Sequence, residues 1–316
     1  MKIIGCGPRL ANPCLVDMRL GMFPHLQRLK IADCDSFECF PADDSLPTSL
    51  TYLGIRRFKR LKKLDVFWLR SLTNLEELRI ADCPLLESLG YCSSDDEFPF
   101  NSTLRFLDVR NCENLKTING AWLRSFTSLE ALHIDHCVKL EKLDVFWLRS
   151  LTNLEELAIH NCPLLESLGY SSDVDDCSSL RVLRVRNCEN VKTINGAWLR
   201  SFTSLQELAI FDCVKLEALP EGGLPRSLTE LWLGGFKNIN RQDWIAIQNL
   251  TSLEILKIYD CRGLNALPVK LPCSLKKLRL LGNHRDLTER CKRDTGPDWP
   301  NIAHVPDIVI WNDDEW

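Results

Sequence analysis

The sequence predicts an α/β solenoid, in which the chain winds into stacked coils that share one parallel sheet. Two observations lead to this prediction. A unit of Leu, two residues, Leu, one residue, Ile or Val, two residues, Cys, two residues and Leu recurs at steps of 22 to 29 residues. In addition, residues 64–143 are written again, almost unchanged, at 143–219. Self-similarity of this kind marks a repeat architecture and outweighs local propensity in assigning the fold.

Eleven units share the pattern, and their first leucines stand at 26, 50, 75, 104, 129, 154, 180, 205, 228, 253 and 275. This period and spacing are those of leucine-rich repeats. We therefore expect a leucine-rich-repeat horseshoe over 23–287, with a parallel sheet on its concave side. Each unit should open with a short strand, because alternation sends the leucines and the Ile or Val inward and the residues between them outward.

Two kinds of return path are expected on the convex side. Segments that begin at Trp68, Trp122, Trp147, Trp198 and Trp244 carry apolar residues at i, i+3 and i+4, which predicts short helices. Segments with Leu-Pro-x-Ser, at 46–49, 224–227 and 271–274, should return extended, because proline forbids a helix. We expect the tryptophans in the core; the alternative is that they form a convex docking surface.

Cysteine usage predicts reduced thiols. Eight of the fifteen cysteines share one place in the unit, at 34, 83, 112, 137, 162, 188, 213 and 261. Phe58, Phe236 and Asn283 fill that place elsewhere, which a disulfide framework would not tolerate. We expect these thiols to point inward at the bend after the strand and to meet backbone carbonyls there. Reduced thiols also indicate the cytoplasm or the nucleus.

Charge and missing motifs narrow the function. The 316-residue chain has a net charge of −4 and no run of eighteen apolar residues, so we expect neither nucleic acid nor a membrane as partner. It lacks a Gly-x-x-x-x-Gly-Lys-Ser/Thr loop, a Cys-x-x-Cys pair, a His-Glu-x-x-His and a Gly-x-Ser-x-Gly sequence. We therefore expect a protein that is not an enzyme and that holds no cofactor or metal.

The two ends depart from the repeat. Residues 1–22 look like the second half of a unit, because Ile3, Cys6 and Leu10 have the right spacing but no Leu-x-x-Leu precedes them. We expect the chain to begin within a repeat, as a piece of a larger protein or the product of a truncated gene. Residues 288–316 should form a capping tail that covers the last strand, with Trp299 and 308–310 closing the core. The acidic segments 92–97 and 173–176 are expected to be solvated bulges at the rim.

The tail carries a specific resemblance. It reads Arg290-Cys291, then Gly296-Pro297-Asp298-Trp299-Pro300, then Ile302-Ala303-His304-Val305-Pro306. This resembles the ending of plant coiled-coil-type NLR disease-resistance proteins, and the Leu-Pro-x-Ser-Leu links and bend cysteines look like that family's repeats. The resemblance implies the recognition domain of an intracellular immune receptor. Its implied partners are a pathogen effector or a host protein, and the receptor's own nucleotide-binding domain.

The duplication compares two versions of one surface. Of 67 aligned residue pairs twelve differ, and nine of the twelve lie at outward positions of the concave strands and bends. These nine are Arg79/Ala158, Ala81/His160, Asp82/Asn161, Phe106/Val182, Asp108/Arg184, Ala131/Glu207, His133/Ala209, Asp135/Phe211 and His136/Asp212. Drift alone would have changed the exposed convex side as freely, yet the helix segments are identical. We interpret the concave face as retuned for a varying partner; the alternative is gene conversion that homogenised only the helices.

The predicted partner-binding residues lie on that face: Arg56, Arg79, Arg110, His133, Asp135, His160, Arg184, Arg186, Phe211, Trp232, Lys257 and Tyr259. Arginines and aromatic residues commonly anchor protein interfaces. The alternative is that they shield one another as cross-strand pairs. His133, Asp135 and His160 are expected on adjacent strands, where they form either a metal site or, more plainly, a solvated cluster that changes charge near neutral pH.

The sequence thus predicts a protein-recognition module of an intracellular plant immune receptor. Its concave face would bind a pathogen effector or a guarded host protein, and the same region would contribute to autoinhibition. A substrate-receptor subunit of an F-box ubiquitin ligase, which also uses cysteine-containing repeats, is an alternative. A freestanding decoy or scaffold is a third.

Overall fold

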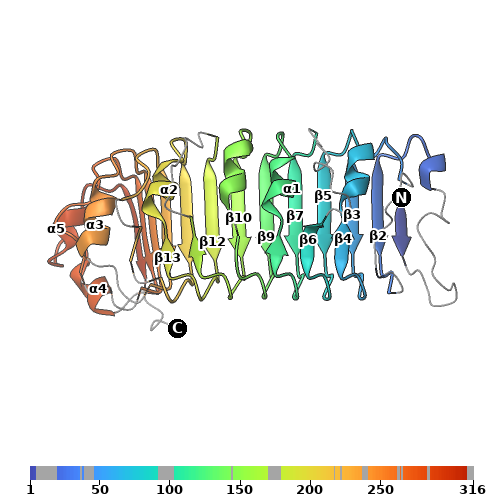
Figure 1. The fold of residues 1–316 in the computed structure, drawn as a ribbon. Coiled ribbons are helices and arrows are strands. Elements are labelled where there is room, and N and C mark those ends of the chain that lie inside the picture. The colour runs from blue at the N-terminus through green and yellow to red at the C-terminus, as the bar shows by residue number, and fades with distance from the viewer. Residues whose placement is uncertain are drawn as a thin grey trace. The chain divides into compact units, whose positions relative to one another are not determined.

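The computed structural model describes residues 1–4, 20–35, 38, 46–91, 103–143, 145–169, 179–216, 218–220, 223–236, 241–261, 264, 266–282 and 285–311. The chain divides into two compact units, unit 1 (Met1–Leu164) and unit 2 (Leu165–Trp316). Within each unit, consecutive coils lie side by side and contribute one strand each to a parallel sheet (Figure 1). No helix among the described residues is long and apolar enough to cross a membrane.

One short strand opens each of the eleven repeats, as predicted. Every one of these strands has five residues and begins two residues after the first leucine of its repeat. In unit 1 they are β2 (Arg28–Ala32), β3 (Tyr52–Arg56), β5 (Glu77–Ala81), β7 (Phe106–Arg110), β9 (Ala131–Asp135) and β10 (Glu156–His160). In unit 2 they are β12 (Val182–Arg186), β14 (Glu207–Phe211), β15 (Glu230–Gly234), β16 (Ile255–Tyr259) and β17 (Lys277–Leu281). Strand β1 (Lys2–Ile4) pairs with β2, and β18 (Asp307–Trp311) pairs with β17.

Neighbouring strands pair in parallel, residue for residue. In unit 1, Leu53 is in register with Leu78 and Leu78 with Leu107; in unit 2, Leu208 is in register with Leu231. The inward side chains therefore stack in columns: the first leucines after Leu26 and the inward strand leucines are buried, whereas Leu26 is partly exposed. A single coil has no core of its own, so this stacking supplies the hydrophobic stabilisation of each unit.

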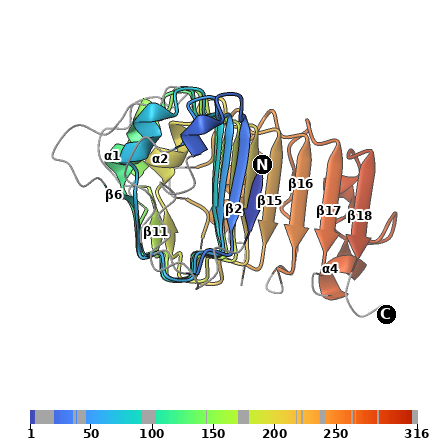
Figure 2. The ribbon, with the colours of Figure 1, turned by 90° about the vertical axis from the view of Figure 1, so that its right-hand side faces the viewer.

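The return paths follow the prediction in outline. Short helices stand at all five tryptophan segments: η3 (Phe67–Ser71), α1 (Gly120–Arg124), η4 (Val145–Ser150), α2 (Gly196–Arg200) and α3 (Arg241–Gln248). They lie across the core from the sheet, as Figure 2 shows for α1 and β2. The Leu-Pro segments form turns instead of helices; the N–H of Leu228, for example, donates to the carbonyl of Pro225. All five tryptophans are buried, so the prediction of core tryptophans is confirmed and the convex docking surface is wrong.

The structure adds elements that the sequence did not predict. Very short strands line the return side of the coils: β4 (Lys63–Asp65), β6 (Ser88–Tyr91) and β8 (Thr117–Ile118) in unit 1, and β11 (Ser167–Leu168) and β13 (Thr193–Ile194) in unit 2. A 3-10 turn, η2 (Leu20–Met22), precedes β2, and the tail contains α4 (Arg285–Arg290) and α5 (Trp299–Ile302).

Local capping distinguishes the return helices α1 and α2 from the 3-10 turn η3. The side chain of Asn119 accepts hydrogen bonds from the N–H groups of Ala121 and Trp122, and Asn195 does the same for Trp198. An Asn at this place satisfies the free N–H groups of the first turn. Val66, which precedes η3, has no side-chain cap, and that segment remains a 3-10 turn.

Each strand ends in the same left-handed bend. The residue before the bend cysteine has a positive φ, between 46° and 60°, at Asp33, Asp82, Asn111, His136, Asn161, Asn187, Asp212 and Asp260. Asp, Asn and His tolerate this region better than other non-glycine residues. The cysteine that follows is buried, and its thiol lies 3.3 to 3.7 Å from the carbonyl oxygen two residues before it. The prediction of inward thiols that meet the bend carbonyls is confirmed, and Phe58 and Phe236 fill the same buried place; Asn283 lies outside the described residues.

The tail closes unit 2, but not with the residues that we predicted. The Arg290 guanidinium donates two hydrogen bonds to Asp298, of 2.9 and 2.6 Å, and Asp298 also accepts the N–H of Leu267 at 3.0 Å. Strand β18 covers the edge of β17, as predicted. The buried residues at this end are Leu287, Cys291, Ile302 and Val305. Trp299 and 308–310 are only partly buried or exposed, because β18 is the outermost strand of the sheet in the described part of the chain.

The remaining sequence expectations concern the N-terminal half-repeat and the two acidic segments. Ile3 lies on β1 in register with Ile31, as a half-repeat requires. Cys6, Leu10 and the acidic segments 92–97 and 173–176 lie outside the described residues.

We predict that the bend cysteines resist alkylation in the folded protein. Burial raises the pKa of Cys137, Cys213 and Cys261 to about 12, from an ordinary value of 9.0. At pH 8 the thiolate fraction is then lower by about 1,000-fold, and the thiolate is the reactive form. Iodoacetamide labelling followed by peptide mapping should modify the exposed Cys273 and leave these three unmodified until denaturant is added. Labelling of the three at the rate of Cys273 would contradict the inward placement.

We also predict that Gly296→Ala loosens the tail. A Cβ at Gly296 would overlap the backbone carbonyl of Arg290, so the chain must shift and weaken the Arg290–Asp298 contact. Overpacking of this kind costs about 1–3 kcal/mol. The matched control is Gly54→Ala, whose Cβ would meet only side-chain atoms of Tyr52, which can move. Limited proteolysis and denaturant unfolding should show a larger loss for Gly296→Ala than for Gly54→Ala; equal losses would refute this account.

Candidate functional site

The candidate site is the open face, defined as the side of each unit's sheet that faces away from the core. It consists of the side chains two, four and six residues after the first leucine of each repeat, together with the bend residue that follows. All nine changed pairs of the duplication lie on these strands and bends. Fifteen of their eighteen side chains are exposed or partly exposed; Asp108, Ala158 and Ala209 are buried among their neighbours.

Three of the arginines that we predicted to bind a partner form ion pairs within unit 1. Arg56 pairs with Asp82, Arg79 with Glu77 and Arg110 with Asp108, each at 2.5 Å. The pKa of the Asp82 carboxyl is affected first by burial, which raises it, but hydrogen bonds from Asn111 and Arg56 outweigh this and lower it. These three arginines therefore already have acidic partners within unit 1, and their role in binding a partner protein stays a prediction.

The His133, Asp135 and His160 positions do lie together on β9 and β10. His160 is in register with Asp135, as predicted. His133, however, approaches Glu156 (Nε2 to Oε1, 3.2 Å) and packs edge-on against Phe106. Asp135 accepts a hydrogen bond from Asn161 (2.7 Å) and lies 2.8 Å from His136. Within the described part of the chain, no group of His, Cys, Asp and Glu is arranged to hold a metal ion.

The two predicted arginines of unit 2 have different kinds of interaction partner. Arg184 donates from Nε and Nη2 to the two carboxylate oxygens of Glu207, at 2.7 and 3.1 Å. Both side chains are largely buried, with 29% and 15% of their surface exposed. Arg186, two residues further along β12, has no carboxylate partner among the described residues. Its guanidinium lies instead over the rings of Phe211 (4.9 Å) and Trp232 (5.9 Å).

An aromatic cluster forms beside Arg186. Phe211 meets Trp232 edge to face, with ring centroids 6.2 Å apart, and it meets Tyr259 at 5.4 Å. Lys257 places its ammonium 3.6 Å from the Trp232 ring centre, and the Trp232 N–H donates to Glu230. The predicted residues Arg186, Phe211, Trp232, Lys257 and Tyr259 are therefore brought together; we call this group the Trp232 patch.

Two small residues make the patch possible. Ala209 separates Arg184 from Trp232 in the sheet, and Gly234 separates Phe211 from Tyr259. A Cβ added at Gly234 would lie 2.5 Å from Phe211, so the Phe211 ring leans into the space that glycine leaves. Ala209 is fully covered. The sequence alternative of mutual shielding is thus partly realised, because the aromatic rings contact one another while keeping exposed area.

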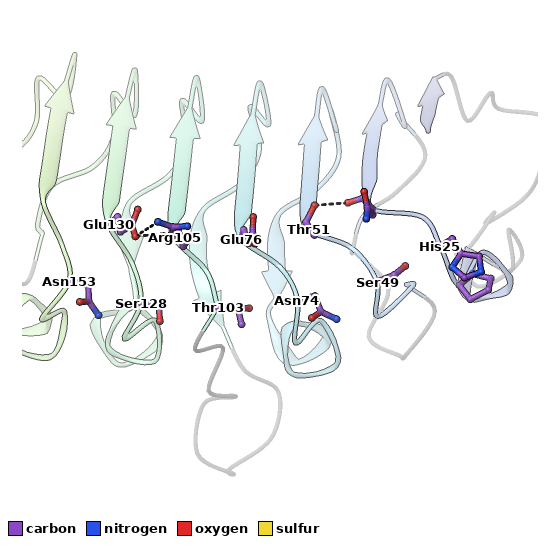
Figure 3. A pocket seen from close by; sticks show the side chains of 12 residues that line it. His25, Ser49, Thr51, Asn74, Glu76, Thr103, Arg105, Ser128, Glu130 and Asn153 are labelled. Atoms are coloured by element: carbon purple, nitrogen blue, oxygen red, sulfur yellow. Dashed lines mark hydrogen bonds and ion pairs between the residues drawn. The ribbon is translucent and has the colours of Figure 1, made fainter.

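A groove of about 730 Å³ runs along the N-terminal ends of the repeat strands in unit 1 (Figure 3). Sequence reasoning missed it, because its lining residues stand just before and just after the first leucine, where we expected only chain reversal. Its polar side chains tie coils together: Ser49 donates to the carbonyl of Leu26, Asn74 to that of Thr48 and Thr103 to that of Leu75. Arg105 pairs with Glu130 at 2.6 Å. We interpret the groove as a structural seam.

Comparisons with known proteins support the fold and do not identify a function or a partner. No protein-family model matches the chain, and no curated protein matches it. Among solved structures, the chain is similar to the leucine-rich repeat domain of the type III effector XopL. The similarity covers 68% of this chain and 71% of that one, with a TM-score of 0.54 and 21% sequence identity. The fold is therefore that of a leucine-rich-repeat solenoid, a class that commonly presents extended binding surfaces.

We predict that the two β12 arginines differ in their effect on stability. Arg184→Ala leaves the largely buried Glu207 without its two charged hydrogen bonds, and such bonds contribute about 1.5–3 kcal/mol. Arg186→Ala removes only a cation–π contact, which contributes about 0.5–1 kcal/mol. Denaturant unfolding of the two variants should therefore rank Arg184→Ala as clearly less stable. Equal destabilisation would mean that Arg186 also holds the fold together and is less available to a ligand.

Proposed function

We propose that this chain is the protein-recognition module of an intracellular plant immune receptor. In this proposal the open face binds a pathogen effector or a host protein that the receptor guards. The same repeats help to hold the receptor's nucleotide-binding domain inactive until that ligand arrives. The chain binds its partner without catalysis, cofactor, nucleic acid or membrane, and it acts in the cytoplasm or the nucleus, where its buried thiols stay reduced.

One observation carries the proposal. Nine of the twelve differences between the duplicated blocks fall on the open face, whereas the helix segments at 68–74 and 122–128 are identical in their second copies. Because Arg124 and its counterpart Arg200 are exposed, the helices were free to change without loss of the fold. Selection for recognition explains why the variation is concentrated on one face.

Two further features support the assignment. The tail from Arg290 to Pro306, with its resemblance to plant coiled-coil-type NLR endings, favours this receptor class. The solenoid fold favours a binding role, because a stack of coils presents one long row of side chains to a protein partner.

The test is a two-hybrid screen of the chain against plant and plant-pathogen coding libraries. We predict that Phe211→Ala with Trp232→Ala weakens binding of the interactors by at least about 30-fold, since truncation of a single anchor residue already costs about 2 kcal/mol. The matched control is Arg124→Ala with Arg200→Ala, which alters exposed residues of α1 and α2 on the other side of the coils. Interactors that survive the first variant and are lost with the control would refute open-face recognition.

A further inference from the structure

Two cations of the Trp232 patch have no acidic partner among the described residues. Arg186 and Lys257 both contact the Trp232 ring, at 5.9 and 3.6 Å. The Nε atom of Arg186 is shielded from solvent and has no hydrogen-bond acceptor. Because this atom is closed to water, a ligand would be held by the other N–H groups of the partly exposed Arg186 guanidinium.

The remaining open-face arginines behave differently. Arg28, Arg56, Arg79, Arg110, Arg184 and Arg279 each lie within ion-pair distance of a carboxylate of the same unit. Acidic side chains are therefore plentiful on this face and have been matched to arginines almost everywhere. The absence of such a match at Arg186 is local, and it coincides with the aromatic cluster.

The aromatic rings make the surroundings of the two cations partly dry. Burial raises the pKa of the Tyr259 hydroxyl, even though Arg279 and Arg186 act to lower it. The rings of Phe211 and Tyr259 lean together over Gly234 and form an apolar floor beside the charges. An ion pair formed here would be screened less by water than one on an open polar surface.

We propose that the Trp232 patch binds an acidic segment of the partner protein. An Asp or Glu side chain of the partner is held by Arg186 and Lys257, and a neighbouring apolar side chain packs on Phe211 and Tyr259. A guanidinium stacked on rings still presents its in-plane N–H groups to a carboxylate. This inference rests on the proposed function and adds the chemistry of the partner to it.

The surrounding charges favour a carboxylate over a phosphate-bearing ligand. Glu230 stands on β15 at the outward position before Trp232, and Glu207 stands on β14 two outward positions before Phe211. A single carboxylate can approach Arg186 and Lys257 without coming close to either glutamate. Glu207 is already paired with Arg184, whereas Glu230 has no cationic partner among the described residues and would repel a dianionic phosphate, or the phosphate chain of a nucleic acid, more strongly than a carboxylate.

The experiment is a selection of random linear peptides displayed on phage against the 316-residue chain, followed by affinity measurements on synthetic copies. We expect peptides whose binding requires Trp232 to be enriched in Asp or Glu beside an aromatic or aliphatic residue. Replacing that residue by its amide, or making Arg186→Gln, should each weaken binding by 10-fold or more. The two changes together should weaken binding by little more than either alone, because they remove the same contact.

Arg279→Gln is the matched control, because Arg279 occupies the same strand position as Lys257 on the next strand but already pairs with Asp307. It should leave peptide affinity within about 2-fold. Circular dichroism of each variant verifies that the coils are intact. Arg186→Lys should give an intermediate affinity, since it keeps the charge and loses the fork.

The outcomes separate this inference from the proposed function. Trp232-dependent peptides that tolerate the amide replacement or Arg186→Gln would overturn the acidic-segment inference and leave open-face recognition standing. Tighter binding of phosphoserine peptides or poly-uridine at the same patch would also overturn it. Failure to select any peptide that depends on Phe211 or Trp232 would count against both.

Discussion

Residue-for-residue pairing of each strand with the next is the constraint on which the rest of the structure depends. No coil can bury its leucines alone, so each must present its inward column to the adjacent coils of its unit. Parallel pairing without a register shift keeps Leu53, Leu78 and Leu107 in one buried line. The same register lines up the outward residues about 4.8 Å apart. The neighbours of an open-face side chain are thereby fixed by the repeat, and only their chemistry is left to vary.

That variation separates structural charges from available ones. In the first copy of the block, the last strand carries Ala131, His133 and Asp135, and its polar groups lie against neighbouring side chains. In the second copy the same three places carry Glu207, Ala209 and Phe211. Glu207 pairs with Arg184, Ala209 leaves space above the sheet because its side chain is small, and Phe211 supplies a ring for Arg186. The two copies thus differ in kind. In the first, Arg110 pairs with Asp108; in the second, Arg184 replaces that aspartate, and Arg186, which has no carboxylate partner among the described residues, lies over the Phe211 ring.

Much of this fold follows from the sequence, because its signals are repeated. The strands, the inward cysteines and the buried tryptophans each recur at a fixed place, so chance local preferences average out. The strands of two to four residues on the return side, such as Thr117–Ile118, are too short to show alternation. The charge pattern was also beyond prediction. Arg79 pairs with Glu77 on its own strand, whereas Arg184 pairs with Glu207 on the next strand. The sequence shows two outward arginines and does not show which carboxylate each one meets. The role of Gly234 and Ala209 emerges only once their larger neighbours are placed.

The closure of the last coil has a consequence for how such proteins change in length. Among the described residues, the hydrogen bonds and strand pairing of the tail join it to the final two repeats: Asp298 to Leu267, His304 to the carbonyl of Pro272, and β18 to β17. Coils can therefore be inserted or deleted upstream by unequal recombination without disturbing the terminus. A fixed ending on an expandable array lets a lineage lengthen its binding surface and still produce a chain that finishes folding in the same way.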